Sequence, residues 1–398
     1  MISILLGSGF SIPEGVKSVT QLNERLNKID ADDIYVHTDK NAFFIEDQET
    51  QNKIIGLPER QFVESFLNFY NEEILGDDNF HYEDFYDFYN AFLREEKNAD
   101  QINEFCDRFN AGLPGDYGKR DPHNRINDFN ITFNQLVGSL LENPTYYKDV
   151  GLGNYPPYDN FIGFLRKMTQ DNQVKVHSLN HDLFFDHIAS KVSGLWEHYS
   201  DGFELQGSRI YGSLRREFKN KGVRIPKDYR VKLKRFTGDF SGKIALYKLH
   251  GSIDNYIAYN LDSDIRIKRD YGVSEFFIEH LPNGKEKYKM SRIHDSIYPD
   301  FLSGSTEKIY RYDNAYYKIL FDHFKENLNN SDSLLVIGYG FQDEGINKIL
   351  KHHYLSENKN MIVIDISEPD TDLIEDENCN LIAKSITEVT SEEIENLM

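Results

Sequence analysis

Cysteine is nearly absent from this chain of 398 residues, in which only Cys106 and Cys379 occur. Two thiols so far apart in sequence exclude a disulfide framework, and they cannot supply a cysteine-rich zinc module. We therefore expect no zinc and predict no metal site. His177 and His181 have a metal-like spacing, but a strand and the turn after it do not place such side chains on one face.

Long apolar runs are also missing, and none approaches the roughly 20 residues that span a bilayer. Ile2–Leu6 is too short for the apolar core of a secretory signal and follows no basic residue. With 28 Phe, 25 Tyr and 39% hydrophobic residues, the composition is that of a globular protein. We expect a soluble, cytoplasmic protein of two or three domains.

Basic residues are fewer than acidic ones, 45 Lys and Arg against 66 Asp and Glu, which gives a net charge of −21. This balance argues against a protein that coats nucleic acid. The exception is Arg215–Arg235, where ten basic and two acidic residues give a local charge of +8. A solvated hairpin or loop, a surface for an acidic partner and a nucleic-acid contact all stay open for this segment.

The chain begins with a short apolar run that ends in glycines. Ile2–Leu6 is typical of a buried strand, and Gly7-Ser8-Gly9 allows a tight turn before a helix. Glycines at such a turn let the backbone approach a ligand closely, and a helix start offers N–H groups to an anion. The pattern favours a nucleotide phosphate site in a Rossmann-like sheet, with an ordinary strand-to-helix turn as the alternative.

Residues 39–156 have a different character. The segments FVESFLNFYNEEIL, HYEDFYDFYNAFLREE and RINDFNITFNQLVGSLL carry aromatic and aliphatic residues three or four positions apart. This spacing predicts amphipathic helices. We predict that residues 39–156 form an α-helical insertion into one discontinuous domain made of residues 1–38 and 157–398.

Strand character returns after this helical region, and the last strands alternate with helix-like segments. The predicted strands are VKVHSLN (174–180), ALYKLHG (245–251), SLLVIGY (333–339), MIVIDIS (361–367) and LIAKSI (381–386). Strands that alternate with helices form a parallel sheet covered on both faces. The sequence therefore predicts an α/β fold with a Rossmann-like parallel sheet, helices on both of its faces and an inserted helical module.

Four of the predicted strands end in small or polar residues. The residues that follow them are Gly7-Ser8-Gly9-Phe10-Ser11, Asn180-His181-Asp182, His250-Gly251-Ser252-Ile253-Asp254 and Gly338-Tyr339-Gly340-Phe341-Gln342-Asp343. Ligands of open α/β sheets bind at the carboxyl ends of the strands, so we predict one site there. Helix capping by Asn180 and Asp182, and a core position for His250, are the alternatives.

Five motifs occur in an order that resembles a known family. GSGFS, SLNHD, KLHGSID, VIGYGFQDEGIN and VIDIS resemble those of the sirtuin (silent information regulator) family, and in particular the sirtuin-like NADases of bacterial anti-phage defence. The resemblance implies a specialised Rossmann fold that takes NAD as its substrate. Two departures matter. The four-cysteine zinc module of sirtuin deacylases is missing, which argues against deacylation, and Ile12 replaces the third glycine of a dehydrogenase fingerprint, which argues against hydride transfer.

The resemblance also implies roles for individual residues. The catalytic residues would be Asn180, which holds water or the ribose, His250, which takes a proton, and Asp182, near the nicotinamide carboxamide. The NAD-binding residues would be Gly7, Ser8, Gly9, Phe10, Ser11, Gly251, Gly338, Gly340, Phe341, Asp343 and Asp365. Among these, the loop after the first strand would hold the pyrophosphate, and Gly338, Gly340 and Asp365 would lie at the adenosine half.

The expected function is hydrolysis of NAD to nicotinamide and ADP-ribose. The resemblance implies abortive infection by NAD depletion, assembly into homo-oligomers and a partner such as a HerA-type ATPase. Three alternatives stay open: a sensor that binds NAD or ADP-ribose without turnover, a metal-dependent nuclease component guided by Arg215–Arg235, and transfer of ADP-ribose to protein.

Overall fold

The computed structural model describes residues 1–36, 42–44, 57–142, 155–204, 208–220, 223–260, 263–269, 273–280, 289–295, 299–301, 315–375 and 377–398. The chain divides into two compact units. The first contains Met1–Val16, Asn143–Ser296 and Asp313–Met398, and the second contains Lys17–Glu142 and Ile297–Tyr312. The domain limits predicted at 38/39 and 156/157 stay a prediction, and the first of them lies outside the described residues.

A seven-stranded sheet is the centre of the first unit, and all of its strand pairs are parallel. Its strands in spatial order are β17 (Cys379–Ala383), β16 (Asn360–Asp365), β15 (Ser333–Ile337), β1 (Ile2–Leu6), β4 (Val174–Ser178), β10 (Ile244–Lys248) and β5 (Tyr199–Ser200). Along the chain, β4 and β10 are added to the sheet on one side of β1, and β15 is added later on the other side. All the strands predicted from the sequence are present.

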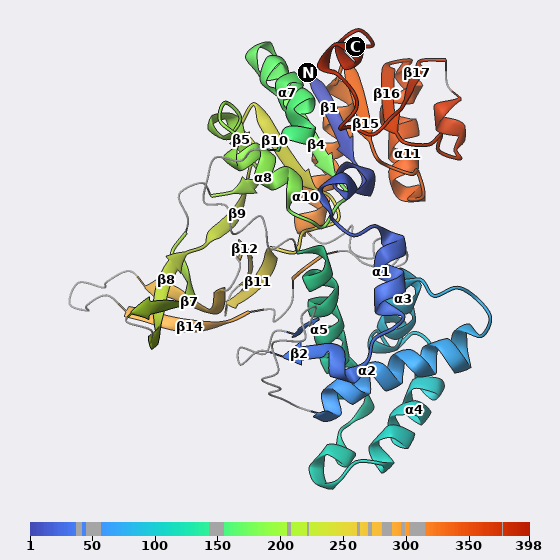
Figure 1. Ribbon diagram of the computed structural model, residues 1–398, viewed down its shortest axis with the longest axis vertical. Coiled ribbons are helices and arrows are strands. Elements are labelled where there is room, and N and C mark those ends of the chain that lie inside the picture. Colours follow the sequence, from blue (N-terminus) through green and yellow to red (C-terminus); the bar gives the residue numbers. More distant parts are fainter. Residues whose placement is uncertain are drawn as a thin grey trace. The chain divides into compact units, whose positions relative to one another are not determined.

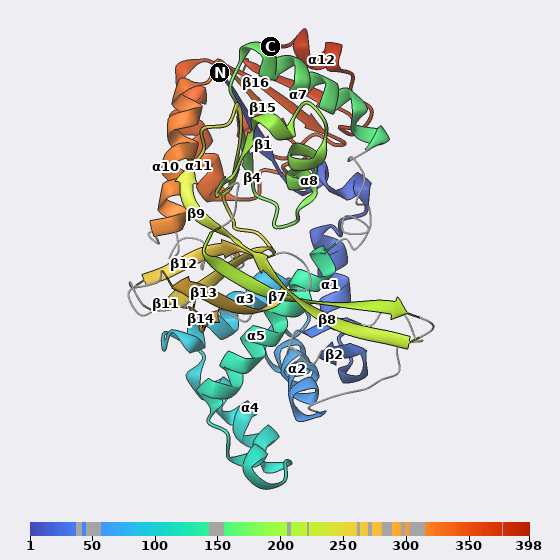
Figure 2. The ribbon, with the colours of Figure 1, turned by 90° about the vertical axis from the view of Figure 1, so that its left-hand side faces the viewer.

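Helices cover both faces of this sheet (Figure 2). One face carries α7 (Asp159–Asp171), α8 (Phe184–Lys191) and α12 (Ser391–Glu395), and the other carries α10 (Ala315–Asn330) and α11 (Glu344–His353). On the first face, apolar residues of the strands and helices form one continuous core that includes Ile4, Val176 and Leu246. The predicted α/β fold class, with helices on both faces of a parallel sheet, is confirmed.

The first unit also contains a sheet that the sequence analysis did not predict. Its eight strands in spatial order are β6 (Gly202–Phe203), β9 (Lys234–Asp239), β12 (Ser263–Lys268), β11 (Asn255–Asn260), β14 (Lys289–Asp295), β13 (Val273–His280), β7 (Ile210–Asn220) and β8 (Val223–Lys232). All pairs are antiparallel. The basic segment Arg215–Arg235 lies mainly in the β7–β8 hairpin, so the structure shows a hairpin where the sequence left a hairpin or a loop open.

The second unit is helical and has an aromatic core. Its helices are α1 (Val19–Leu26), α2 (Leu57–Phe69), which continues as a π-helix (Tyr70–Leu75), α3 (Tyr82–Leu93), α4 (Ala99–Ala111) and α5 (Pro122–Leu141), beside a small pair of strands, β2 (Ile34–Val36) and β3 (Ala42–Phe44). Phe66 contacts Phe85 and Phe129 with ring centroids 5.6 and 4.9 Å apart. The three aromatic segments of the sequence form helices as predicted, and the predicted helical module is present.

No helix in the described part of the chain is both long and apolar enough to cross a membrane.

Candidate functional site

The ends of four central strands meet at one edge of the parallel sheet (Figure 1). Leu6 pairs with Ser178 of β4 and with Ile337 of β15, and Ser178 pairs in turn with Lys248 of β10. The residues that follow these four positions are therefore neighbours in space. They are the polar strand ends that the sequence singled out.

Asn180 ties the end of β4 to the loop after β1. Its Nδ2 donates hydrogen bonds to the carbonyl oxygen of Gly7 at 2.8 Å and to Oγ of Ser11 at 3.2 Å. Its backbone N–H donates to Oγ of Ser178 at 3.2 Å. The side chain thus bridges two loops and does not cap the following helix, which gives its amide plane a fixed orientation.

Asp182 lies behind Asn180 and is buried. Its Oδ1 accepts hydrogen bonds from Oγ of Ser11 at 3.1 Å and from the backbone N–H of Phe184, the first residue of α8, at 2.8 Å. Burial raises the pKa of this carboxyl, against the opposing effects of Lys248 and the two hydrogen bonds. The N-cap residue of α8 is Leu183, and Asp182, one position before it, accepts from the first N–H of the helix as the capping alternative suggested, while the same oxygen also accepts from Ser11.

His250 faces a carboxylate from another strand end. Its Nε2 lies 3.4 Å from Oδ2 of Asp343, and its side chain is 5% exposed. Oδ1 of the same Asp343 caps α11, because it accepts hydrogen bonds from the N–H groups of Gly345 and Ile346 at 2.9 and 3.1 Å. The helix cap fixes the carboxylate, and the carboxylate is placed to orient the imidazole. A histidine beside a carboxylate is an arrangement that can serve as a general base with its positioning group.

The turn with Asn180 and the loop with His250 are joined directly. The backbone N–H of Ile253 donates to the carbonyl oxygen of His181 at 3.0 Å, and the rings of His181 and His250 have centroids 6.3 Å apart. Asn180 and His250 were predicted to share a site on the basis of strand order. Asp343 was expected among the NAD-binding residues, and the structure places it beside His250.

The glycines after β1 are required by close packing of two loops. A Cβ built on Gly7 would lie 2.4 Å from the carbonyl oxygen of Gly338, and one on Gly338 would lie 2.4 Å from the carbonyl carbon of Gly9. Gly338 also has a φ of +61°, a conformation that favours glycine. The contact therefore leaves no room for a side chain at Gly7 or Gly338.

The N–H groups of this loop are largely used within the fold. Those of Gly7, Gly9, Phe10 and Ser11 donate to carbonyl oxygens of Ile337, Gly338, Gly7 and Ser8 at 2.9 to 3.0 Å. The side chain of Phe10 is buried against Tyr158, Phe161 and Phe184. Ser8 is exposed. The pyrophosphate contact of this loop stays a prediction, and Ser8 is an exposed residue of the loop.

The remaining predicted binding residues lie along the same edge. Phe341 has a φ of +56°, which is unusual for a residue with a side chain, and Nδ2 of Asn347 holds its carbonyl oxygen at 2.7 Å. Gly251 also has a positive φ, of 79°. Gly340 is exposed, and Asp365 is half-buried at the end of β16. Their roles in nucleotide binding stay predictions.

A buried ionic cluster lies next to these loops, and it was not predicted from the sequence. Nζ of Lys268 lies 2.9 Å from Asp186, 2.7 Å from Asp201 and 3.5 Å from Asp254, and Nζ of Lys248 lies 3.4 Å from Asp186. Burial lowers the pKa of Lys268, but the three carboxylates outweigh this effect and hold the pKa well above its usual value. Lys248 also donates to the backbone carbonyl of Asp182.

This cluster links β12 of the antiparallel sheet to α8 and to the Asn180–Asp182 turn. Its members are spread over more than 80 positions, so no local pattern reveals it. Of its members, only Lys248 and Asp254 lie in one of the five motifs, KLHGSID. Asp201 directly precedes β6, which pairs with β9.

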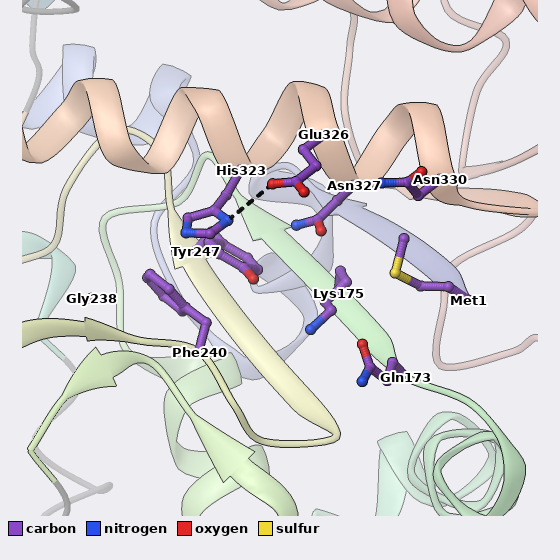
Figure 3. Close-up of a pocket in the computed structure, with 10 residues that line it drawn as sticks. All are labelled: Met1, Gln173, Lys175, Gly238, Phe240, Tyr247, His323, Glu326, Asn327 and Asn330. Atoms are coloured by element: carbon purple, nitrogen blue, oxygen red, sulfur yellow. Dashed lines mark ion pairs between the residues drawn. The ribbon is translucent and has the colours of Figure 1, made fainter.

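No group of three or more His, Cys, Asp and Glu residues within the described ranges is arranged to hold a metal ion. His177 packs against Tyr247 and Phe324, with ring centroids 4.9 and 4.7 Å apart, while His181 lies near His250. A cavity of about 380 Å³ is present in the first unit (Figure 3), but it is lined by residues such as Gln173 and Lys175 at the start of β4. It is therefore separate from the strand ends described above.

Some solved structures and one family model are similar to this chain. Among curated proteins, none matches this chain. Two solved structures are similar over 100% of this chain: one described as Sir2-p53 peptide-NAD+ (9% identity, 92% of that chain, TM-score 0.35), and one described as Sir2Tm bound to a propionylated peptide (10% identity, 92% of that chain, TM-score 0.36). Residues 213–386, which contain His250, Gly338 and Asp343, match the model of the SIR2-like domain, the family that the motifs indicated.

Proposed function

We propose that this protein is an NAD+ glycohydrolase that cleaves NAD to nicotinamide and ADP-ribose. The observation that carries the proposal is that the turn with Asn180 and the loop with His250, which lies 3.4 Å from Asp343, follow the neighbouring strands β4 and β10 at one edge of the parallel sheet. Similarity to the SIR2-like domain supports NAD as the substrate. In this proposal Asn180 is the amide that orients water or the ribose, and His250 is the base that accepts the proton of the attacking water. Hydrolysis at the anomeric carbon of NAD needs these two functions.

The chemistry requires no general acid. The nicotinamide ring of NAD is cationic, so it leaves as a neutral molecule when the bond between its nitrogen and C1′ of the ribose breaks. The new bond joins C1′ to the oxygen of water, and the released proton passes to the imidazole of His250. Asp343, 3.4 Å from Nε2, stabilises the imidazolium that forms.

Asn180 would orient the attacking water or the ribose. Both hydrogen bonds of its side chain with the described part of the chain use Nδ2, so its Oδ1 is the atom for a ligand. Asp182 would act through its neighbours, because its carboxylate already holds Ser11 and the start of α8. The direct contact of Asp182 with the nicotinamide carboxamide, which the resemblance implies, stays a prediction.

The biological setting is a further proposal that rests on the motif resemblance. It comprises abortive infection by NAD depletion, assembly into homo-oligomers and a partner such as a HerA-type ATPase. Because a partner of this kind can activate the enzyme, each activity assay is run with and without the product of a neighbouring gene.

The test compares variants by product analysis. NAD is incubated with the protein, and nicotinamide, ADP-ribose and cyclic products are resolved by chromatography. Asn180→Ala and His250→Ala should each lower the rate of nicotinamide release on the order of 100-fold or more, as expected for loss of a positioned base or its water. His352→Ala, which alters an exposed histidine of α11, is the matched control and should keep the wild-type rate.

Two other results would redirect the assignment. Intact NAD under every condition, together with measurable NAD binding, would contradict hydrolysis and favour a sensor. Label from radioactive NAD that appears on protein would show transfer of ADP-ribose in place of its release into solution.

A further inference from the structure

The two faces of the parallel sheet differ in polarity. The face toward α7, α8 and α12 carries apolar side chains, among them Ile4, Val176 and Leu246. Buried strands of parallel sheets are usually apolar on both faces. On the α10 face, however, β4 presents Lys175 and His177, and both are buried. A buried lysine lowers the free energy of unfolding unless its ammonium group is paired with an anion or hydrogen-bonded.

The register explains why there is space around Lys175. Its partners on the neighbouring strands are Ser3 of β1 and Ala245 of β10, which are both small. The next pair on the same face, His177 and Tyr247, has large rings that stack with centroids 4.9 Å apart. The small side chains therefore leave a hollow beside Lys175 on this face of the sheet, and the rings of His177 and Tyr247 fill the surface two residues further along the strands.

This hollow opens into a cavity of about 380 Å³, which we call the α10 pocket (Figure 3). The residues that line it are Met1, Gln173, Lys175, Gly238, Phe240, Tyr247, His323, Glu326, Asn327 and Asn330. Phe240 stacks on Tyr247 with ring centroids 4.2 Å apart, and His323 contacts both rings. One wall is thus aromatic, and amide groups of Gln173, Asn327 and Asn330 lie on the others.

The α10 pocket contains one lysine and one carboxylate side chain, and within the described ranges these two form no ion pair with each other. Oε2 of Glu326 instead lies 3.8 Å from Nδ1 of His323. Lys175 is 7% exposed, and within the described ranges its Nζ makes no hydrogen bond or ion pair. Burial lowers the pKa of this amine, and the more distant Glu326 opposes the effect. His177 below it is neutral at physiological pH, because burial lowers its pKa to about 3.

We infer that the α10 pocket binds a small aromatic carboxylate, with the carboxylate at Nζ of Lys175 and the ring against Phe240 and Tyr247. An anion would satisfy a buried cation, and a flat ring fits an aromatic wall. The volume is in the range of small-molecule sites. This site is distinct from the strand ends that carry Asn180 and His250, and it does not depend on the proposed hydrolysis.

Benzoate is the probe for this inference, and it is titrated into the full chain by calorimetry. Benzamide has nearly the same shape without the charge, and inorganic phosphate has charge without a ring. Benzoate should bind at least tenfold more tightly than either. Lys175→Met should abolish the preference for benzoate over benzamide. Lys318→Met, which alters an exposed lysine of the same helix α10, is the matched control and should leave benzoate binding unchanged.

A second variant guards against a folding defect in Lys175→Met. Gln173 is exposed at the pocket, so Gln173→Glu should fold normally and weaken benzoate binding about tenfold by adding a negative charge beside Lys175. Asn180→Ala should bind benzoate like the wild type, which separates this site from the proposed NAD site. Equal affinity for benzoate and benzamide, stronger binding of phosphate, or benzoate binding that neither pocket variant weakens would overturn the inference.

Discussion

At the scale of single residues, two side chains of the candidate site each make hydrogen bonds that hold the local backbone and also place a polar group at the site. Asn180 joins two loops and presents an amide, and Asp343 caps a helix and faces His250. The sequence predicted that these residues meet, because each follows a strand of one parallel sheet. It did not predict that Asp343 pairs with His250, since that contact depends on how the loop after β15 folds.

Asp343→Asn tests the pairing with His250. An amide oxygen can still accept the two hydrogen bonds that cap α11, so the fold should be kept, while the charge near the imidazole is lost. The rate of nicotinamide release should fall on the order of tenfold or more. Asp372→Asn, at an exposed partner of Lys351, serves as the control. An unchanged rate in Asp343→Asn would show that His250 works without this carboxylate.

Gly7→Ala tests the loop contact. A Cβ at Gly7 would lie 2.4 Å from the carbonyl oxygen of Gly338 and 2.6 Å from Cα of Tyr339, so the loops must separate. The free energy of unfolding should fall by about 1–3 kcal/mol. Gly112→Ala, where the nearest atom is 3.5 Å away, should have a much smaller effect in the same denaturant titration. Equal midpoints for the two variants would contradict the packing argument.

At the scale of elements, the sequence was informative where a strand is a short run rich in apolar residues. Six of the seven strands of the parallel sheet are such runs and were predicted, whereas the two-residue strand β5 (Tyr199–Ser200) was not. The antiparallel strands were missed because their residues are mostly polar, with partly buried and exposed positions alternating in β9, and because only a small apolar cluster lies on them. Long-range pairing, which no local pattern encodes, decides their structure.

Lys268→Met tests the ionic cluster that joins β12 to α8. The variant keeps the volume of the side chain but removes the cation beside Asp201 and Asp254 and leaves Asp186 with Lys248. The free energy of unfolding should fall by about 3–5 kcal/mol, as for removal of one partner from a buried ion pair. Lys348→Met breaks an exposed pair with Glu344 and should change it by about 1 kcal/mol or less. A similar small loss in both variants would contradict a structural role for the cluster.

At the scale of the whole molecule, buried histidines predict how stability depends on pH. Burial lowers the pKa of His177 to about 3 and that of His187 to about 4. Below pH 6.5 the unfolded chain binds protons at these positions and the folded chain does not, so stability falls as the pH falls from 6.5 toward 4. The slope is about 1.4 kcal/mol per pH unit for each histidine.

Carboxyl groups modify this profile at lower pH. Lys268 and Lys248 outweigh the effect of burial and hold the pKa of Asp186 below its usual value, so its contribution is present above about pH 4 and is lost below. Burial raises the pKa values of Asp182 and Asp254, which gives a trend in the opposite direction. Denaturant titrations at pH 7, 5.5 and 4.5 measure the sum. His177→Phe should reduce the slope between pH 6.5 and 4.5, and an unchanged slope would contradict the assignment.

The measurement that tests the central claim most directly is the stoichiometry of NAD cleavage by the wild-type protein, alone and with its candidate partner. The account predicts that NAD disappears while nicotinamide and ADP-ribose form in equal amounts, and that His250→Ala stops both. NAD that binds and stays intact under all conditions, or a rate that His250→Ala leaves unchanged, would contradict the account.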